Sequence, residues 1–590
     1  MSPIPGTVVA VRSTGGDEVA RDQPLVVVES MKMEHAIRSP VAGVVEAIAV
    51  QVGETVERDQ TVAVVRQAIA GEADPTGAAE DHLVHTPSLD EARDRHARLE
   101  DHRRPEAVER RRAQGRRTAR ENLADLIDPG SFTEFGALAI AAQSGRRSHE
   151  DLIDRTSTDG VITGVGTIGS ATFDRCEAAV IVYDATVLAG TQGYRGHQKQ
   201  DRILETAHRR RLPVVVFAEG GGGRPGDVDV PIITGLDVRT FRMMAAMRRV
   251  APSVAVVAGY CFAGNAVLAA GADAIIATAD SNLGAGGPAM IEGGGLGVFD
   301  PTEIGPIDDQ VRSGVVDMRA ADEAHATSLA RRYLGYFQGS VPGWSSVDQT
   351  ELETIVPEDR KQLYDTWRVI EVVCDSGSVL ELRPQWGPGM VTALGRVEGH
   401  PVGILANVPA NLGGAIDARV ADKAARFLDL CGTYDLPVVV LCDTPGFMVG
   451  PESERQGLLR AAGDMLKAAA RVTTLGTVVL RKGYGLGAQA MAGGAFQSGA
   501  FTVSWPTGEF GAMNLEGAVR LGYRKELQAI DDLEERQLLY ERLVAKSYER
   551  GKALMMAGTF EIDAVIDPAD TRRWISAMAR SAPVPRWRAG

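Results

Sequence analysis

The sequence predicts a small all-β unit followed by a larger α/β region built from two similar halves. Two internal repeats and one change in composition lead to this prediction. Gly6 returns as Gly43 at an offset of 37 residues, and Leu212 returns as Leu436 at an offset of 224 residues. Between the two repeats the chain turns to Ala, Gly, Glu, Asp, Pro and Thr without apolar periodicity, which indicates a linker.

The bulk composition limits the class of protein. A chain of 590 residues exceeds the roughly 250 to 300 residues at which one core stops growing, so two or three folding units are expected. No stretch approaches the roughly 20 apolar residues that span a bilayer, and no secretory signal opens the chain, so we expect a cytoplasmic protein. A net charge of -15 argues against nucleic acid as a partner. The five cysteines form no C-x-x-C pair, so we expect neither disulfides nor a metal site.

The first repeat describes a small β-sandwich. Val19-x-Arg21-Asp22-Gln23 returns as Val56-x-Arg58-Asp59-Gln60, and each copy ends in a valine-rich run. Short valine-rich runs separated by glycine are typical of strands and tight turns. The segment Glu-Ser-Met-Lys-Met-Glu connects the two copies, so symmetry predicts that Lys32 lies at the tip of a hairpin and faces solvent.

This first unit, from Pro3-Ile4-Pro5-Gly6 to the Met31-Lys32-Met33 motif, resembles the biotinyl domain of biotin-dependent carboxylases. The resemblance implies a biotinyl/lipoyl-type flattened barrel-sandwich, covalent biotin on Lys32, and attachment by a biotin protein ligase. Met31 and Met33 complete the biotinylation motif. Lipoyl domains share the fold and also modify a hairpin lysine, but they usually lack the two methionines. The alternative without modification is an ordinary solvated lysine.

We divide the chain into a carrier domain (1-67), a flexible linker (68-87) and two further domains (88-350 and 351-590). About 20 linker residues reach at most roughly 65 Å, which suits a carrier that moves between two active sites. Tethering raises the local concentration of such a carrier toward the millimolar range. The alternative is a passive spacer.

An arginine-rich segment from Leu89 to Leu126 opens the second region. Acids such as Glu106 and Glu109 lie among the arginines, and this mixture favours a solvated helix. In the alternative interpretation, some of the arginines contact the phosphates of a coenzyme. The cluster includes Arg103, Arg104, Arg110, Arg111, Arg112, Arg116, Arg117 and Arg120.

The second repeat keeps its register over a long distance. Gly259-Tyr260 returns as Gly483-Tyr484, and Glu292-Gly293 returns as Glu516-Gly517, both at the offset of 224. Each half alternates apolar strands with helical stretches, such as 239-250 and 454-470, which predicts a layered α/β unit. The opening strands of the two halves are expected near Val161 and Val391.

Glycine-rich strand ends are the candidate chemical sites. Gly220 to Gly223 follow one buried strand, and Gly483 to Ala488 follow another. Glycine lets a ligand approach main-chain N–H groups closely. Two such donors aimed at one oxygen form an oxyanion hole, in which each donor lowers a reaction barrier by about 3 kcal/mol. The alternative is a pair of tight turns required only for packing.

Residues from about 90 to 590 resemble the carboxyltransferase of acyl-CoA carboxylases, a family built from two tandem crotonase-like (ClpP/crotonase) domains. Asp443-Thr444-Pro445-Gly446-Phe447 and Trp505-Pro506-Thr507 look like landmarks of this family. The resemblance implies that Gly221 and Gly222 hold the thioester oxygen of acyl-CoA. It implies that Leu486 and Gly487 hold the ureido oxygen of biotin. It also implies a hexamer, with each site formed between the first half of one subunit and the second half of another.

The sequence departs from the family pattern at both loops. Gly220 and Gly223 stand where relatives have Ser and Ala, and Ala488 and Gln489 stand where propionyl-type enzymes have Tyr and Asp. We expect a smaller residue in this place, as with Ala488 for Tyr, to open the pocket to a longer or bulkier acyl chain, so Ala488 and Gln489 are the candidate pocket residues. The order of the domains resembles the C-terminal part of single-chain long-chain acyl-CoA carboxylases, which points to fatty acid metabolism.

The predicted function is transfer of CO2 from carboxybiotin on Lys32 to the α-carbon of an acyl-CoA, through an enolate held by the two oxyanion holes. No ATP-grasp-like domain and no phosphate loop is found in the sequence, so a separate biotin carboxylase that uses ATP and Mg is expected as a partner. Two alternatives remain: a decarboxylase or transcarboxylase that runs the reaction in reverse, and a non-catalytic biotin carrier scaffold. The acyl chain and the direction of transfer stay open.

Overall fold

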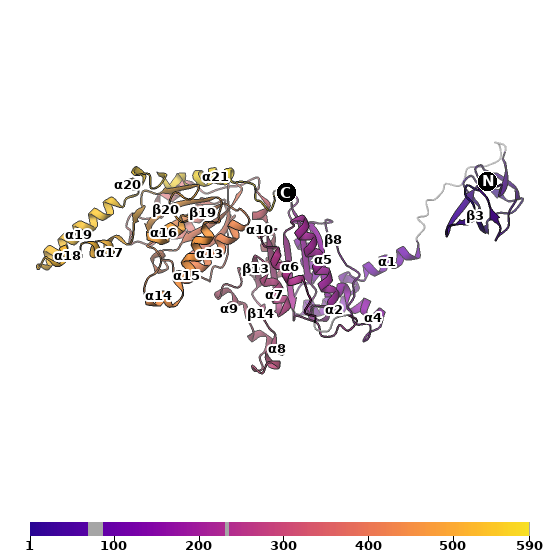
Figure 1. Ribbon diagram of the computed structural model, residues 1–590, viewed down its shortest axis with the longest axis horizontal. Helices are drawn as coiled ribbons and strands as arrows, with labels where there is room; N and C mark the ends of the chain where they lie inside the picture. The colour runs from indigo at the N-terminus through magenta and orange to yellow at the C-terminus, as the bar shows by residue number, and fades with distance from the viewer. Residues whose placement is uncertain (69–85, 231–234, 589–590) are drawn as a thin grey trace. The chain divides into compact units, whose positions relative to one another are not determined.

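A computed structural model describes residues 1-68, 86-230 and 235-588 (Figure 1). The chain separates into two compact units, Met1–Leu89 and Asp90–Gly590. Most of the predicted linker lies outside the described residues. Each unit is therefore described by itself.

The first unit is a sandwich of two small sheets, as predicted. One sheet has the strand order β4-β3-β1-β6 and the other has the order β2-β5-β7. Apolar side chains, mostly valines such as Val26, Val28 and Val56, fill the space between the sheets. The strands are β1 (Gly6–Val11), β2 (Glu18–Val19), β3 (Pro24–Ser30), β4 (Met33–Arg38), β5 (Gly43–Ile48), β6 (Thr55–Val56) and β7 (Ala63–Gln67).

The sequence repeat at an offset of 37 residues corresponds to a symmetry in the structure of this unit. The N–H of Gly53 donates to the carbonyl of Val8 (2.7 Å), and the N–H of Gly16 donates to the carbonyl of Val45 (2.8 Å). Each half thus closes the turn of the other half. A Cβ on Gly43 would lie 2.1 Å from the carbonyl oxygen of Arg66, so glycine is needed at this crossing.

The arginine-rich segment is divided between α1 (Pro87–Ala97), α2 (Pro105–Ala113) and α3 (Ala119–Leu126). The expectation of one solvated helix is wrong. Pro105 starts a new helix because it lacks the N–H that a helix interior requires. Thr118 starts another through a capping box with Glu121.

The first half of the second unit is an eight-stranded sheet with the order β15-β13-β12-β11-β10-β9-β8, and β14 pairs with β12. The strands from β10 to β13 run parallel, which brings their carboxyl ends to one edge. The strands are β8 (Thr133–Glu134), β9 (Val161–Thr167), β10 (Glu177–Tyr183), β11 (Val214–Gly220), β12 (Ser253–Phe262), β13 (Ala274–Thr278), β14 (Asn282–Gly284) and β15 (Met318–Ala320).

Helices accompany this sheet (Figure 1). They are α4 (His149–Arg155), α5 (Tyr194–Arg210), α6 (Thr240–Ala246), α7 (Gly264–Ala270), α8 (Pro288–Gly293), α9 (Ile307–Arg312) and α10 (Glu323–Gln338), with a short 3-10 helix η3 (Leu188–Gly190) before α5. The helix expected over 239-250 is present as α6. It ends at Ala246, three residues before Arg249, whose backbone is left-handed.

The second half repeats this architecture, with the strand order β16-β17-β18-β19-β20-β21-β23 and β22 paired with β20. The strands are β16 (Leu380–Glu381), β17 (Met390–Val397), β18 (His400–Asn407), β19 (Val438–Thr444), β20 (Leu475–Tyr484), β21 (Phe501–Ser504), β22 (Glu509–Gly511) and β23 (Ala564–Val565). The two opening strands that the sequence predicted are β9 and β17.

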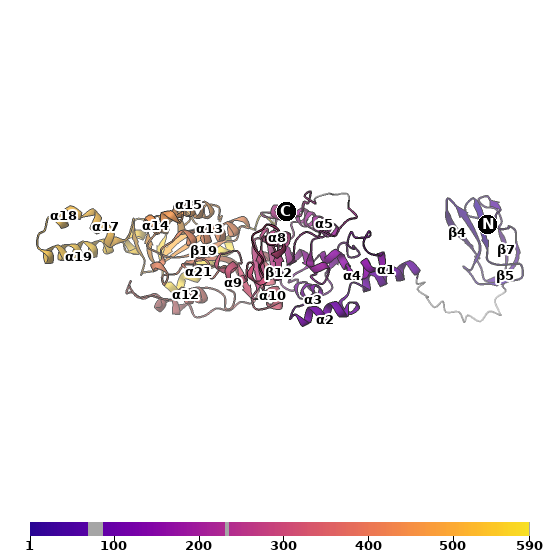
Figure 2. The same ribbon diagram turned by 90° about the horizontal axis from the view of Figure 1, so that it is seen from below.

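The helices of this half include a protruding hairpin formed by α17 (Leu515–Gly522), α18 (Arg524–Gln528) and α19 (Leu533–Arg550), which lie side by side in both views (Figures 1 and 2). The helix expected over 454-470 is interrupted at Gly457, whose φ is 80°, and begins again as α15. The others are α11 (Leu352–Ile355), α12 (Thr366–Val373), α13 (Ala418–Thr433), α14 (Pro451–Arg455), α15 (Leu458–Ala469), α16 (Gly485–Met491), α20 (Ala553–Gly558) and α21 (Thr571–Ser581).

The two halves share core side chains. The ring of Phe337 from α10 lies edge-on to the ring of Tyr434, with centroids 5.5 Å apart. The hydroxyl of Tyr434 donates to the carboxylate of Asp273 (2.6 Å). The predicted division at residue 350 falls between β15 and β16, the strands that end one sheet and begin the other.

Candidate functional site

Lys32 lies in the two-residue turn between β3 and β4. Ser30 pairs with Met33 across the hairpin, and both Met31 (φ 51°) and Lys32 (φ 66°) are left-handed. A two-residue turn of type I′ requires positive φ at both central positions, because only this twist matches the twist of the strands. The side chains therefore project from the sheet: Met31 is 96% exposed and Met33 is 65% exposed.

Gly221 and Gly222 lie at the carboxyl end of β11, where a cavity of about 450 Å³ opens. Gly221 lines this cavity, and no group in the described residues accepts its N–H. The N–H of Gly222 is already donated to the Oδ1 atom of Asn265 (2.9 Å). The loop thus presents one main-chain donor to the cavity. The lining consists of Ala107, Arg110, Arg111, Gln114, Ala185, Thr186, Ala189, Thr191, Glu219, Gly220, Gly221, Tyr260, Phe262 and Pro301.

Arg111 joins α2 to this strand end. Its two terminal nitrogens donate to the two carboxylate oxygens of Glu219, both at 2.6 Å. Burial raises the pKa of Glu219, although the hydrogen bonds from Arg111 act in the opposite direction. A bidentate pair of this kind fixes the backbone of Glu219 just before the glycine loop.

Several arginines of the predicted solvated segment are in fact buried in ion pairs. Arg104 binds Asp184 (2.8 Å) with its side chain 12% exposed, and Arg120 binds Glu134 (2.8 Å) with its side chain 16% exposed. They fold back because α2 and α3 pack beside carboxylates at the edge of the sheet. Arg110 is different: it is exposed, lines the cavity, and has no ion pair within the part of the chain that the structure describes.

Arg224 holds the other end of the glycine loop. Its side chain, 4% exposed, forms an ion pair with the fully buried Asp159 and donates to the carbonyl of Thr191 (2.9 Å). Asp159 also accepts the N–H of Gly196 at the start of α5 (2.6 Å). The loop is thus fixed at both ends by buried guanidinium–carboxylate pairs.

In the second half, Leu486 and Gly487 lie in the first turn of α16. The first N–H groups of a helix have no carbonyl partner within the helix, so they point outward as donors. A Cβ on Gly487 would lie 2.7 Å from the backbone of Gly446, which explains the glycine. Of the two predicted pocket residues, Gln489 is exposed, whereas Ala488 is fully buried in the core.

In the second half, a buried carboxylate also lies at the end of β19, before the loop that contains Pro445 and Gly446. Asp443 stands at the offset of 224 from Glu219 and is fully buried. It accepts a hydrogen bond from the hydroxyl of Tyr364 (2.9 Å) and lies 3.1 Å from the ammonium of Lys482. The two halves therefore place the same kind of group at the same strand end, with different cationic partners.

The backbone N–H group that is available as a donor occupies a different position in each half. Gly221 corresponds to Pro445, which has no N–H, so the loop of the second half offers no donor there. Ala263 corresponds to Gly487, but its N–H is bound by the carbonyl of Gly284 (3.1 Å). Strand β12 continues to Phe262, whereas β20 ends at Tyr484 and α16 starts immediately.

The residues that the sequence did not single out are Asn265, Glu219 and Asp443 as loop supports. A signal for Asn265 was present, since it is the polar residue in the apolar run from Cys261 to Val267. Its partners were not predictable, because they come from two distant segments of the chain, at Gly190 and at Glu219 to Gly222.

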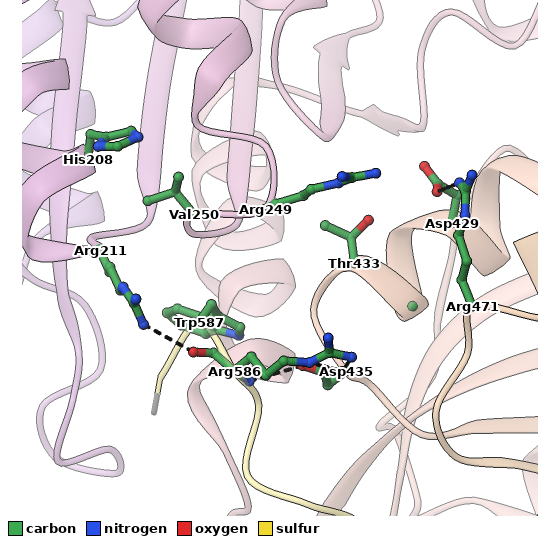
Figure 3. Close-up of a pocket in the computed structure, with 11 residues that line it drawn as sticks. His208, Arg211, Arg249, Val250, Asp429, Thr433, Asp435, Arg471, Arg586 and Trp587 are labelled. Carbon is green, nitrogen blue, oxygen red and sulfur yellow. Dashed lines mark hydrogen bonds and ion pairs between the residues drawn. The ribbon is translucent and has the colours of Figure 1, made fainter. Parts of the chain in front are cut away.

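A second cavity, of about 530 Å³, lies between the two halves (Figure 3). Arg586 binds Asp435 (2.9 Å) and Arg471 binds Asp429 (3.1 Å) along its wall. In the close-up, the side chain of Arg249 extends toward the side of the cavity where Asp429 and Arg471 lie (Figure 3). None of the predicted site residues lines this cavity.

Within the described residues, no helix combines the length and the apolar character that a membrane span requires. The same residues also contain no group of three or more His, Cys, Asp or Glu side chains placed to hold a metal ion.

Comparisons with known proteins cover both units. The carboxyl transferase domain family matches residues 110-583, and the biotin-requiring enzyme family matches residues 1-65. The methylmalonyl-CoA carboxyltransferase 12S subunit of Propionibacterium freudenreichii subsp. shermanii is 33% identical over 80% of this chain and 89% of its own length. The propionyl-CoA carboxylase beta chain of Saccharopolyspora erythraea is 30% identical over 80% of this chain and 89% of its own length.

Solved structures agree. A single-chain, multi-domain long-chain acyl-CoA carboxylase is 53% identical with a TM-score of 0.80, over 98% of this chain; the chain spans 55% of the length of that protein. The transcarboxylase 12S structure, a hexamer assembly, is 30% identical with a TM-score of 0.73, over 85% of this chain and 95% of its own. The tandem crotonase-like fold is thereby confirmed. The chain belongs to the biotin-dependent acyl-CoA carboxylases, as a carboxyltransferase with its own biotinyl domain.

Proposed function

We propose that this chain carboxylates long-chain acyl-CoA at its α-carbon, with biotin on Lys32 and with the acyl group bound in the cavity at the end of β11. The observation that carries the proposal is the N–H of Gly221 at the wall of that cavity, which has no acceptor among the described residues. The neighbour that is 53% identical acts on long-chain acyl-CoA, and the apolar side chains of Tyr260, Phe262 and Pro301 line the cavity.

The Lys32 turn fits covalent biotin. The side chain projects from a rigid hairpin, and it has no ion pair or hydrogen bond with any described residue. Biotin supplies the transferable carboxyl group and a base for the α-proton when it is bound. Met31 and Met33, both exposed, are proposed to form the surface that a biotin protein ligase recognises.

The residues around the cavity are proposed to stabilise negative charge. Removal of the α-proton moves charge onto the thioester oxygen, and the N–H of Gly221 is proposed to donate to this oxygen. A preorganised donor needs no reorganisation as the charge develops, which is why it lowers the barrier. Gly222, whose own N–H is occupied, is proposed to shape the loop, and Arg110 is proposed to bind a phosphate of the coenzyme.

On the biotin side, we propose that the N–H groups of Leu486 and Gly487 hold the ureido oxygen. Gln489, exposed on the same helix, is proposed to face the acyl chain, whereas the fully buried Ala488 acts by keeping α16 close to the core. We further propose a hexamer, in which the first half of one subunit meets the second half of another, as the hexameric 12S relative suggests. The division at residue 350 marks these two halves.

A biotin carboxylase that uses ATP and Mg is the proposed partner, in a separate subunit. Several relatives are described as beta chains or carboxyltransferase subunits, which supports a division of labour between chains. The cytoplasm is the proposed compartment, and the five buried free thiols are compatible with a reducing environment.

A second candidate function is transfer in the opposite direction, from a carboxylated acyl-CoA to biotin. The relative that is 33% identical is a methylmalonyl-CoA carboxyltransferase subunit, and this identity favours the candidate. Incubation of the protein with malonyl-type CoA and free biotin measures the reverse half-reaction. Turnover there also excludes a scaffold without activity.

The test of the main proposal starts with the intact mass of the protein after expression with a biotin ligase. We expect a gain of one biotinyl group, lost in Lys32→Arg and kept in Lys525→Arg, a control at another exposed lysine. Addition of a biotin carboxylase, ATP, bicarbonate and an acyl-CoA panel should then give carboxylation fastest with the long chains. Absence of the mass gain would refute the carrier assignment, and a preference for propionyl-CoA would refute the long-chain assignment.

A further inference from the structure

Asn265 in α7 is a fully buried amide whose hydrogen bonds all go to main-chain groups. Its Oδ1 atom accepts the N–H of Gly222 at 2.9 Å. Its Nδ2 atom donates to the carbonyl of Gly190 at 3.1 Å and to the carbonyl of Glu219 at 2.8 Å. Both amide hydrogens and the amide oxygen are therefore used. A buried side chain with this many partners is costly to replace, because each partner would lose its hydrogen bond.

The three partners belong to two walls of the cavity at the end of β11. Gly190 ends the η3 turn, whose neighbours Ala189 and Thr191 line the cavity. Glu219 and Gly222 flank Gly220 and Gly221, which line it from the other side. Asn265 itself does not line the cavity. It therefore acts on the cavity only through the backbone that it holds.

The two walls pack so closely that neither backbone segment has space for an added side chain. A Cβ on Gly220 would lie 2.1 Å from the carbonyl oxygen of Gly190, so the two glycines pack backbone to backbone. Gly222 (φ 85°) packs against Ala263, the residue before α7, where a Cβ would lie 2.8 Å from the Ala263 methyl. Loss of the amide would free both segments at once.

The hydrogen bond from Gly222 to Asn265 also decides which N–H faces the cavity. With the N–H of Gly222 turned inward to the amide, the N–H of Gly221 is the one left toward the cavity. The second half solves the same problem with another side chain. There the hydroxyl of Thr444 accepts the N–H of Gly446 (3.1 Å), while Gln489, the counterpart of Asn265, is exposed.

We propose that Asn265 is a positioning residue for the acyl-CoA half-reaction: its side-chain amide fixes the loop from Gly220 to Gly223 so that the N–H of Gly221 points at the thioester oxygen. This inference rests on the proposed function, in which Gly221 binds that oxygen. Hydrogen-bonded supports of this kind give an oxyanion site its precision, because the donor must be in place before charge develops.

The test compares Asn265→Ala with Gln338→Ala in the full biotinylated protein. Gln338 is a matched control: its amide is also buried and donates to one carbonyl, that of Ile168 (2.9 Å), but it does not contact the loop. We expect Asn265→Ala to lower kcat for acyl-CoA carboxylation by about 10- to 100-fold, less than the loss of a whole donor. The KM should change less than about threefold, and Gln338→Ala should leave both constants near those of the wild type.

A spectroscopic measurement separates positioning from general destabilisation. Acyl-CoA labelled with 13C at the thioester carbonyl is bound in the absence of a carboxyl donor, and the C=O stretch is read by infrared difference spectroscopy. In the wild type and Gln338→Ala the stretch should shift to lower frequency on binding, because the N–H of Gly221 polarises the bond. In Asn265→Ala this shift should largely disappear. A thioether analogue without the carbonyl oxygen should bind all three proteins with equal affinity.

The outcomes are distinct. An Asn265→Ala protein that keeps the wild-type shift and kcat overturns the inference. If the alanine variant does not fold, Asn265→Asp preserves the volume but faces two carbonyl oxygens with a carboxylate, and it should show the same loss of shift. A wild-type protein that carboxylates no acyl-CoA would instead refute the proposed function, since the inference concerns only how that reaction is supported.

Discussion

Two residues in the carrier unit adopt a backbone conformation that their side chains disfavour. Met31 and Lys32 both have positive φ, a position usually taken by Asn-Gly in a two-residue hairpin. Each non-glycine residue in this conformation costs of order 1 kcal/mol or more. We propose that the turn keeps these residues for attachment of biotin, at a cost in stability.

Met31→Gly tests this conflict. Because glycine accepts φ 51° without strain, we expect the substitution to stabilise the carrier unit by about 1 kcal/mol while slowing attachment of biotin. Urea denaturation measures the first effect, and the time course of mass gain with a biotin ligase measures the second. Gly16→Ala is the control of opposite sign, since it forces alanine to φ 98° and should destabilise the unit. Faster attachment in Met31→Gly would contradict the interpretation.

Lys199 in α5 carries a buried ammonium that supports the glycine loop indirectly. It donates to the carbonyls of Thr158 (2.8 Å) and Val161 (2.5 Å), on either side of the left-handed Asp159 that binds Arg224. Burial lowers the pKa of the ammonium to about 8, although Glu134 and Asp159 act in the opposite direction. Lys199 is therefore a charged group whose burial is unfavourable at neutral pH.

The sign of the pH dependence follows. Between pH of about 8 and about 10 the folded state holds Lys199 neutral while the unfolded chain keeps it protonated, so its contribution to the free energy of unfolding rises with pH. The rise is about 2 to 3 kcal/mol and is lost as the pH falls through about 8. Urea denaturation of the wild type and Lys199→Met across this range measures it. A difference between the two proteins that does not grow with pH would exclude a lowered pKa.

At the scale of elements, the two halves differ where a strand gives way to a helix. Strand β12 runs to Phe262 before α7, whereas β20 stops at Tyr484 and α16 begins at once. The first arrangement uses the N–H of Ala263 in the sheet, and the second leaves the N–H groups of Leu486 and Gly487 in an open helix turn. The two halves therefore differ in how the backbone N–H groups are used where the strand gives way to the helix.

Gly487→Ala tests the donor site of the second half. The new methyl would lie 2.7 Å from the backbone of Gly446, so α16 must move away from the loop. We expect a loss of at least about tenfold in the biotin-dependent rate, which corresponds to about 1.4 kcal/mol in the barrier, and a lower Tm. Gly463→Ala in α15 is the matched control, because its Cβ meets nothing within 4 Å and alanine favours a helix. Full activity in Gly487→Ala would exclude the close approach as a requirement.

At the scale of the molecule, the carrier unit has a core of its own, formed by residues such as Val8, Val28 and Val45. A carrier that is attached to the enzyme works at an effective concentration set by the connection between the two units.

Separation of the units should therefore lower the rate without changing the chemistry. With residues 1-68 and 86-590 expressed as two proteins at about 10 μM each, we expect carboxylation roughly 100-fold slower than in the intact chain. The rate should rise in proportion to the concentration of biotinylated carrier, and circular dichroism should confirm that both parts are folded. An unchanged rate would mean that the carrier binds its partner too tightly for tethering to matter.

The sequence by itself determined the domains in outline, because both repeats can be recognised as local patterns of residues. Valine runs with glycine at the offset of 37 specify the small sandwich, the repeat at the offset of 224 specifies the two similar halves, and the glycine-rich loops mark where strands end. The position of Lys32 at the tip of a hairpin followed from the symmetry of the repeat alone. The lysine tip is a local feature, and its backbone geometry depends mainly on the residues that form it.

Only the tertiary structure decided which N–H groups are available and what supports them. Asn265 reaches carbonyls 46 and 75 residues away, and Arg111 reaches Glu219 across 108 residues. The sequence predicted solvated arginines because it records their mixture with acids but not the distant carboxylates that bury Arg104 and Arg111. Hydrogen bonds and ion pairs between segments far apart in the chain depend on how the strands are ordered in the sheet, which no local pattern records.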